Sequence, residues 1–357
     1  MKRNVLSALL AAWLVWSGTV GAADFMFRAR VDGKMLEGKP LSWSADQMLL
    51  LGRDGQLYRF NPKKAKESQK TSPRFFGYSP SEMKVQLQKE FGKQFEVTET
   101  RHYLVVHSQG ERDEWANRFE DLYKRFEHYF RVRGFKLEEP PYPLVAVVFR
   151  NEADYRRHAE ASGTPVPPRW LGHYSPISNR IFLFDSTTGD AAHWSTNADT
   201  IIHEATHQTA YNSGVHRRFS GTPRWVSEGL ATMFEARGVW SSQYDNTQAD
   251  RINRGRHFGF KDLVSNRWKP GMVVNLISSD RMFQSDEADA YALAWAMSFY
   301  LCETQPRLYG QYLAKTAERP MFGGYAAAER VADFEDIFGS EWKMFEMKFL
   351  RYMAEVK

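Results

Sequence analysis

The chain has 357 residues, of which 43% are hydrophobic and 25% are charged. This composition is ordinary for a folded globular protein and excludes a chain that is disordered over most of its length. The formal net charge of +5 is small and dispersed, which argues against a protein that binds nucleic acid.

The first 22 residues have the three parts of a secretory signal peptide. Lys2 and Arg3 give a positive start, residues 5–20 are mostly apolar, and small residues lead up to Ala22. We expect cleavage near Ala22, export to a bacterial periplasm or to the medium, and no stable membrane insertion afterwards. The competing interpretation is an uncleaved membrane anchor. Cys302 is the single cysteine, so an internal disulfide is excluded.

Short apolar runs separated by Asp-Gly pairs occupy residues 25–61. The pairs at 32–33 and 54–55 are typical of hairpin turns. We therefore predict a small, barrel-like β module at residues 23–62, either a lid or spacer or a ligand-binding unit. Residues 63–80 are polar and rich in lysine, and we interpret them as a linker.

The remaining residues, 81–357, mix helical and strand patterns. Helices are predicted at 81–91, 113–129 and 152–159, and a closing helix at 334–353; strands are predicted at 95–108 (as a pair), 144–149 and 180–184. Trp115, Phe119, Leu122 and Phe126 recur at helical spacing and are predicted to face the core. The fold class expected is α+β, with a mixed sheet beside a helical subdomain.

The segment His203-Glu204-Ala205-Thr206-His207 carries the strongest chemical signal. On a helix predicted over residues 197–212, positions i and i+4 share a face, so both imidazoles can bind one zinc ion. Glu204 would stand beside them, ready to act on a zinc-bound water. A hydrolytic zinc site needs a third protein ligand and one position left for water.

A second helix is predicted to begin at Thr222 and Pro223 and to end near Gly238. Its second turn carries Glu228, followed by small residues that would let this helix approach the first one closely. Glu235 lies seven residues after Glu228 on the same face. It could accept a hydrogen bond from the far nitrogen of a ligand histidine, or it could be plain helix surface.

The chain resembles the gluzincin metallopeptidases in two motifs. These are H-E-x-x-H and, about 20 residues later, W-x-x-E-G-x-A-x-x-x-E. The second motif is most similar to the membrane-alanyl-aminopeptidase branch, although Ser227 replaces an asparagine and the spacing from His207 to Glu228 is slightly longer. From about Phe95 to the C-terminus, the chain is most similar to an uncharacterised bacterial family known as DUF1570.

The resemblance implies a gluzincin-like metallopeptidase domain at residues 81–357. It implies Zn²⁺ bound by His203, His207 and Glu228, with Glu204 as the general base. Tyr291 matches a tyrosine that donates a hydrogen bond to the developing oxyanion, although a core tyrosine is the rival interpretation. The strand at 180–184 would be the edge strand that pairs with an extended peptide.

The function predicted is therefore an exported zinc peptidase that acts on a peptide or protein substrate. The exopeptidase branch has a G-x-M-E-N segment that binds a free α-amine, and its absence here favours an endopeptidase. The alternative is a non-catalytic protein that binds a peptide or an envelope polymer on a gluzincin scaffold. A zinc-dependent amidase is a third possibility.

Overall fold

The computed structural model describes residues 25–110, 114–168, 170–185, 194–240 and 247–357. The predicted signal peptide lies outside these residues. None of the described helices is both long and apolar enough to cross a membrane. The chain forms two compact units, one with residues up to 92 plus 141–143 and 177–179, and one with 93–140, 144–176 and 180–357. Both contain a five-stranded sheet, so the class is mixed α and β.

The first unit holds an antiparallel sheet of order β4-β3-β2-β1-β5. The strands are β1 Met26–Val31, β2 Lys34–Trp43, β3 Met48–Gly52, β4 Leu57–Phe60 and β5 Lys66–Ser72. Asp32 and Gly33 form the predicted two-residue turn between β1 and β2, with φ angles of 48° and 83°. Phe27, Ala29 and Leu50 belong to the buried apolar face.

The predicted linker at residues 63–80 is wrong for much of its length, because it contains β5, which pairs with β1. Every residue of β5 is polar and most are exposed, so the strand lacks the apolar alternation that would reveal it. Helix α2 (Pro80–Phe91) follows, with Ser79 and Glu82 forming a capping box.

The second unit holds a mixed sheet of order β6-β7-β8-β10-β9. The strands are β6 Phe95–Glu99, β7 Tyr103–Ser108, β8 Leu144–Phe149, β9 Gly172–Ser175 and β10 Arg180–Phe184. β8 runs parallel to both of its neighbours, whereas β9 is antiparallel to β10. All six residues of β8 are buried, as expected for a central strand that is covered on both faces.

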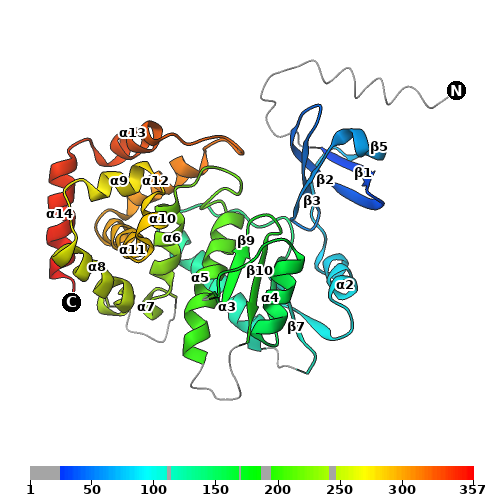
Figure 1. The fold of residues 1–357 in the computed structure, drawn as a ribbon, viewed down its shortest axis with the longest axis horizontal. Coiled ribbons are helices and arrows are strands. Elements are labelled where there is room, and N and C mark those ends of the chain that lie inside the picture. The colour runs from blue at the N-terminus through cyan, green and yellow to red at the C-terminus, as the bar shows by residue number, and fades with distance from the viewer. Residues whose placement is uncertain (1–24, 111–113, 169, 186–193, 241–246) are drawn as a thin grey trace. The chain divides into compact units, whose positions relative to one another are not determined.

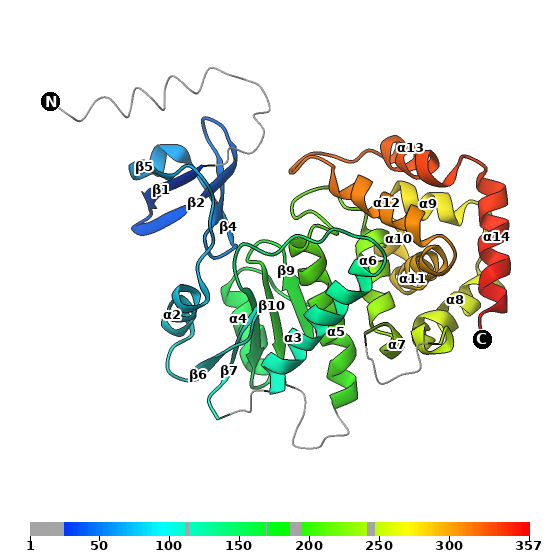
Figure 2. The same ribbon diagram turned by 180° about the vertical axis from the view of Figure 1, so that it is seen from behind.

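Two helices cover one face of this sheet (Figures 1 and 2). α3 (Glu114–Arg131) and α5 (Trp194–Asn212) share one buried cluster with β8 and β10. Trp115, Phe119 and Phe126 of α3 are buried and Leu122 is partly buried against the same core, which confirms the predicted core face. α4 (Glu152–Ala161) packs on the opposite face, where Tyr155 contacts Phe149.

The position predicted for the edge strand is wrong. β10 lies inside the sheet, between β8 and β9, and β9 is the edge on that side among the described strands. β9 has only four residues and no apolar alternation, so the sequence gives little sign of it.

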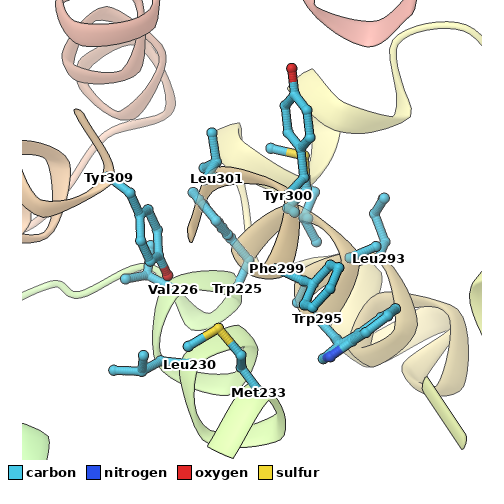
Figure 3. Packing of buried hydrophobic residues seen from close by; sticks show 14 of the residues in the cluster. Trp225, Val226, Leu230, Met233, Leu293, Trp295, Phe299, Tyr300, Leu301 and Tyr309 are labelled. Carbon is cyan, nitrogen blue, oxygen red and sulfur yellow. The ribbon is translucent and has the colours of Figure 1, made fainter. Parts of the chain in front are cut away.

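The rest of the second unit is helical. Its helices are α6 Arg224–Phe234, α7 Arg237–Trp240, α8 Arg254–Asn266, α9 Met272–Ser278, α10 Met282–Ser285, α11 Glu287–Thr304, α12 Pro306–Ala317, α13 Ala327–Phe338 and α14 Trp342–Glu355. α11 lies at their centre and is buried from Ala290 to Leu301 except at Tyr291. Figure 3 shows its Trp295 and Phe299 near Trp225 of α6.

The closing helix predicted over 334–353 is two helices. α13 ends at Phe338, and Gly339 follows with a φ of 88°. Glycine adopts this left-handed conformation without steric cost, so it is the usual residue just after a helix end. The aromatic spacing continues across the break, which is why the two helices appear as one in the sequence.

Candidate metal centre

Helix α5 positions both histidines and Glu204. It begins at Trp194, earlier than the predicted residue 197, and ends at Asn212 as expected. Ile201 and Ala205 pack on the sheet, whereas Ile202 packs into the helical core. The helix is therefore fixed from two sides, which sets the direction of the face that carries His203 and His207.

Helix α6 supplies Glu228, and its start differs from the prediction. The N-cap is Pro223 and not Thr222, and there is no side-chain cap hydrogen bond at this helix start. Instead, the backbone N–H of Arg224 donates to Oδ1 of Asp280 over 3.0 Å, and Asp280 also pairs with Arg330 at 2.7 Å. A distant carboxylate thus replaces the local cap that the sequence predicts.

Gly229 lets α6 approach a different helix from the one predicted. A Cβ atom at this position would lie 2.5 Å from the carbonyl oxygen of Ala294 and 2.3 Å from Oγ of Ser298. Both contacts belong to α11, not to α5. The glycine therefore sets the depth at which α6 sits on α11, and with it the position of the adjacent Glu228.

Three ligand-type atoms from α5 and α6 meet at one point. Nε2 of His203 lies 3.1 Å from Nε2 of His207 and 3.2 Å from Oε2 of Glu228, and the third side of the triangle measures 3.4 Å. Their side chains are 12–13% exposed, so the site is sheltered but open to one cavity.

These distances fit a zinc ion. Two ligands about 2.1 Å from one ion, at a tetrahedral angle, are about 3.4 Å apart. Two imidazole nitrogens and one carboxylate oxygen are also the donor set that zinc prefers in catalytic sites. The three donors could therefore bind one zinc ion with little movement, which leaves the fourth position to face the cavity.

The electrostatics of the three donors favour a cation between them. Burial alone would lower the pKa of His203, but hydrogen bonds with Glu228 and Glu235 outweigh burial and raise it well above its usual value. Burial alone would raise the pKa of Glu228, but His207 and His203 lower it well below its usual value. The cluster therefore retains positive charge at its centre, whether as a proton or as a metal ion.

Glu235 contacts the opposite side of His203. Its Oε1 lies 2.8 Å from Nδ1 of His203, and its Oε2 accepts a hydrogen bond from Nδ2 of Asn253 at 2.6 Å. Asn253 also donates to the backbone oxygen of Thr232. When Nδ1 of His203 carries the proton and donates it to Glu235, the other ring nitrogen, Nε2, is left to bind the metal. Sequence reasoning missed Asn253, whose only local signal is its place as the N-cap of α8.

Glu204 is held by the edge strand. Its Oε2 accepts a hydrogen bond from the backbone N–H of Tyr174 in β9 over 2.6 Å. The contact of Glu204 with the edge strand could not be predicted from the sequence, because β9 itself was not predicted.

Tyr291 reaches the site from α11. Its ring centroid lies 6.5 Å from that of His203, and its hydroxyl interacts with both Arg224 and Glu228. Burial, followed by the charge of Glu228, raises the pKa of Tyr291, so its hydroxyl is protonated at neutral pH. The side chain is only partly buried, at the edge of the core.

All six residues that the sequence analysis named as site residues line one cavity of about 460 Å³. Sequence reasoning missed its other walls, which are Trp170 to Tyr174 on and before β9, Asp199 and Thr200 on α5, Arg224 on α6 and Arg256 on α8. His216, in the loop after α5, is buried at 1% exposure, and its ring stands 5.3 Å from that of Tyr211.

A family model described as "Protein of unknown function (DUF1570)" matches residues 197–323, which include α6, α11 and most of α5. Among curated proteins, none matches the chain.

Solved structures of an M1 zinc metallopeptidase from Deinococcus radiodurans are similar to the chain at low identity. One has 15% identity and a TM-score of 0.39, and it covers 73% of this chain and 50% of that chain. A mutant bound to a Tyr-Ser-Ala substrate has 17% identity and a TM-score of 0.36, with the same coverage. The chain thus spans about half the length of these structures.

Proposed function

We propose that the protein is an exported, zinc-dependent peptidase with a gluzincin-like catalytic domain. The observation that carries the proposal is the triangle of His203, His207 and Glu228 atoms, with Glu204 beside it on the wall of the same cavity. A structural role alone would not require three donors that are only 12–13% exposed to converge on one point.

His203, His207 and Glu228 would hold the zinc ion, with Glu235 orienting His203. When bound, zinc supplies a Lewis acid that polarises a carbonyl group and increases the acidity of water. Glu204 takes a proton from the attacking water as its oxygen bonds to the peptide carbonyl carbon. Glu204 then passes this proton to the leaving nitrogen as the C–N bond breaks. The hydrogen bond from Tyr174 keeps Glu204 oriented for both transfers.

Tyr291 donates a hydrogen bond to the oxygen that gains charge during this attack. Because its pKa is raised, the phenol carries its proton over the whole neutral range. Arg224 interacts with the Tyr291 hydroxyl and stands 3.6 Å from Oε1 of Glu228, so it links the oxyanion donor to a metal ligand.

The substrate would enter along β9. Gly172 and His173 line the cavity on the strand that forms the edge of the sheet among the described strands, where an extended peptide can pair with the backbone beside Tyr174, whose own N–H is held by Glu204. This assigns to β9 the role predicted for the strand at 180–184. A chain lying along an edge strand can continue in both directions, which favours an endopeptidase.

The test compares wild type, Glu204→Gln and the exposed control Glu355→Gln in a digest of an unbiased peptide library, with metal content measured for each. Wild type and control should cleave peptides, and Glu204→Gln should retain zinc but lose cleavage. Zinc with no turnover in wild type would contradict the proposal and favour the non-catalytic peptide- or polymer-binding protein. Hydrolysis of non-peptide amides alone would favour an amidase.

Export is tested separately. N-terminal sequencing of the protein recovered from cells should find the mature chain beginning close to Ala23. Recovery of the full-length chain in the membrane fraction would contradict cleavage and favour an anchor.

A further inference from the structure

Two arginines from different helices lie close to the Tyr291 ring in the cavity. Arg256, in the first turn of α8, has its guanidinium carbon 4.8 Å from the centre of the Tyr291 ring. Arg224, in the first turn of α6, lies 5.9 Å from the same centre and 4.7 Å from that of Phe283. Both arginines line the cavity, so two cationic groups border the proposed reaction site.

The two arginines differ in what balances their charge. Arg224 faces the Glu228 carboxylate and interacts with the Tyr291 hydroxyl, so its polar contacts are within the site. The guanidinium of Arg256 forms no ion pair with any carboxylate among the described residues; its partner there is the Tyr291 ring.

The acidic residues nearest the metal centre have other partners. Glu228 and Glu235 both contact His203, and Glu204 accepts the Tyr174 N–H. Arg256 is thus a half-buried cation that borders the reaction site and has a planar, forked set of donors.

We propose that Arg256 binds a carboxylate of the substrate beside the scissile bond, so that the enzyme prefers peptides with an acidic group at this place. An arginine stacked on an aromatic ring keeps its guanidinium oriented, and its fork suits a carboxylate in a bidentate pair. The proposal rests on the peptidase function proposed above and specifies its substrate class.

The carboxylate could come from an Asp or Glu side chain or from a free peptide C-terminus. Asp199, which lies on α5 one turn before His203, lines the same cavity and would attract the opposite charge. Basic peptides are therefore a necessary arm of the test, because a preference for them would assign the selecting role to Asp199.

The first measurement is binding to the zinc-loaded Glu204→Gln protein by calorimetry, which does not depend on turnover. The first probes are alanine heptapeptides with both ends blocked, in which one residue at a time is replaced by Glu, Gln or Lys. The second set consists of the same Gln peptides with a free C-terminal carboxylate. We expect at least one Glu or free-carboxylate probe to bind about tenfold more tightly than its blocked Gln counterpart, as for a charge-assisted pair. The set that shows this gain identifies the source of the carboxylate.

Adding Arg256→Gln to this protein should remove the gain and leave the affinity for blocked Gln peptides within about twofold. Arg254→Gln is the matched control, because it removes the same charge half a turn away on α8. The Arg254 side chain is exposed and donates to the backbone oxygen of Ala249, so this variant should leave the affinity for every probe unchanged. If Arg256→Gln does not fold, Arg256→Lys keeps the charge but loses the fork, and it should weaken binding of the acidic probe alone.

Equal binding of Glu and Gln probes, tighter binding of Lys probes, or an equal loss in Arg254→Gln would each overturn the proposal. With the Glu204-containing enzyme, Arg256→Gln should raise KM for the acidic peptide about tenfold with little change in kcat. Failure of the peptidase function would appear differently, as absence of cleavage in wild type together with an intact binding preference.

Discussion

Replacing Gly229 by alanine tests whether the contact between α6 and α11 sets the metal centre. The added Cβ would stand 2.5 Å from the backbone oxygen of Ala294, whereas ordinary carbon–oxygen contacts are nearly an ångström longer. Oγ of Ser298 is also too close, and it already accepts a hydrogen bond from Tyr309. Because the Ala294 oxygen belongs to a helix backbone, α6 itself must move.

The magnitude follows from two opposing effects. Overpacking a well-packed core costs about 1–3 kcal/mol. Replacing glycine by alanine inside a helix raises the free energy of unfolding by about 0.5–1 kcal/mol. We therefore expect Gly229→Ala to lower the free energy of unfolding by about 1–2 kcal/mol.

Gly259 provides a matched control. It lies inside α8 and also faces α11, but a Cβ there would meet only the Cβ of Ala292 at an ordinary 3.4 Å. Gly259→Ala should keep the gain in helix propensity without the clash, and so raise stability by up to about 1 kcal/mol. The difference between the two variants isolates the cost of overpacking.

The assay is denaturant unfolding of both variants, together with zinc titration. Gly229→Ala should be less stable and should bind zinc more weakly, because movement of α6 displaces the adjacent Glu228. Gly259→Ala should bind zinc as wild type does. Equal stability of the two variants, or full zinc affinity in a destabilised Gly229→Ala, would show that this contact does not position the ligand.

Four further predictions concern the site. Glu235→Gln should weaken zinc binding about tenfold or more in a competition titration, since His203 loses its charged partner; unchanged affinity would count against the orienting role. Tyr291→Phe should lower kcat about 100-fold with zinc content unchanged, as for loss of an oxyanion donor. Because the pKa of Tyr291 is raised, the tyrosine-dependent part of the rate should persist up to about pH 10, and its loss by about pH 9 would contradict this. Removal of zinc by a chelator should abolish cleavage and lower the melting temperature, and added zinc should restore both; cleavage that survives chelation would exclude a zinc mechanism.

The sequence was informative where short-range geometry decides the structure. Four-residue spacing on a helix brings His203 and His207 together, and seven-residue spacing puts Glu235 on the same face as Glu228. The Asp32-Gly33 turn likewise needs only two residues with positive φ. In each case the relevant distance is set within one element.

The sequence was uninformative where partners are brought together by the fold. Asp280 caps α6 from 56 residues away, and Tyr174 reaches Glu204 from a four-residue strand with no recognisable pattern. Gly229 looked like a small residue facing α5, although α11 is the helix that it approaches. Arg256 became a candidate only when α8 placed it beside Tyr291.

The most direct test of the metal centre is diffraction from crystals of the zinc-loaded protein, recorded at the zinc absorption edge. We predict a single anomalous peak about 2.0–2.2 Å from Nε2 of His203, from Nε2 of His207 and from a carboxylate oxygen of Glu228. A peak elsewhere in the molecule, or an ion bound by the two histidines with the carboxylate of Glu228 turned away, would contradict the account.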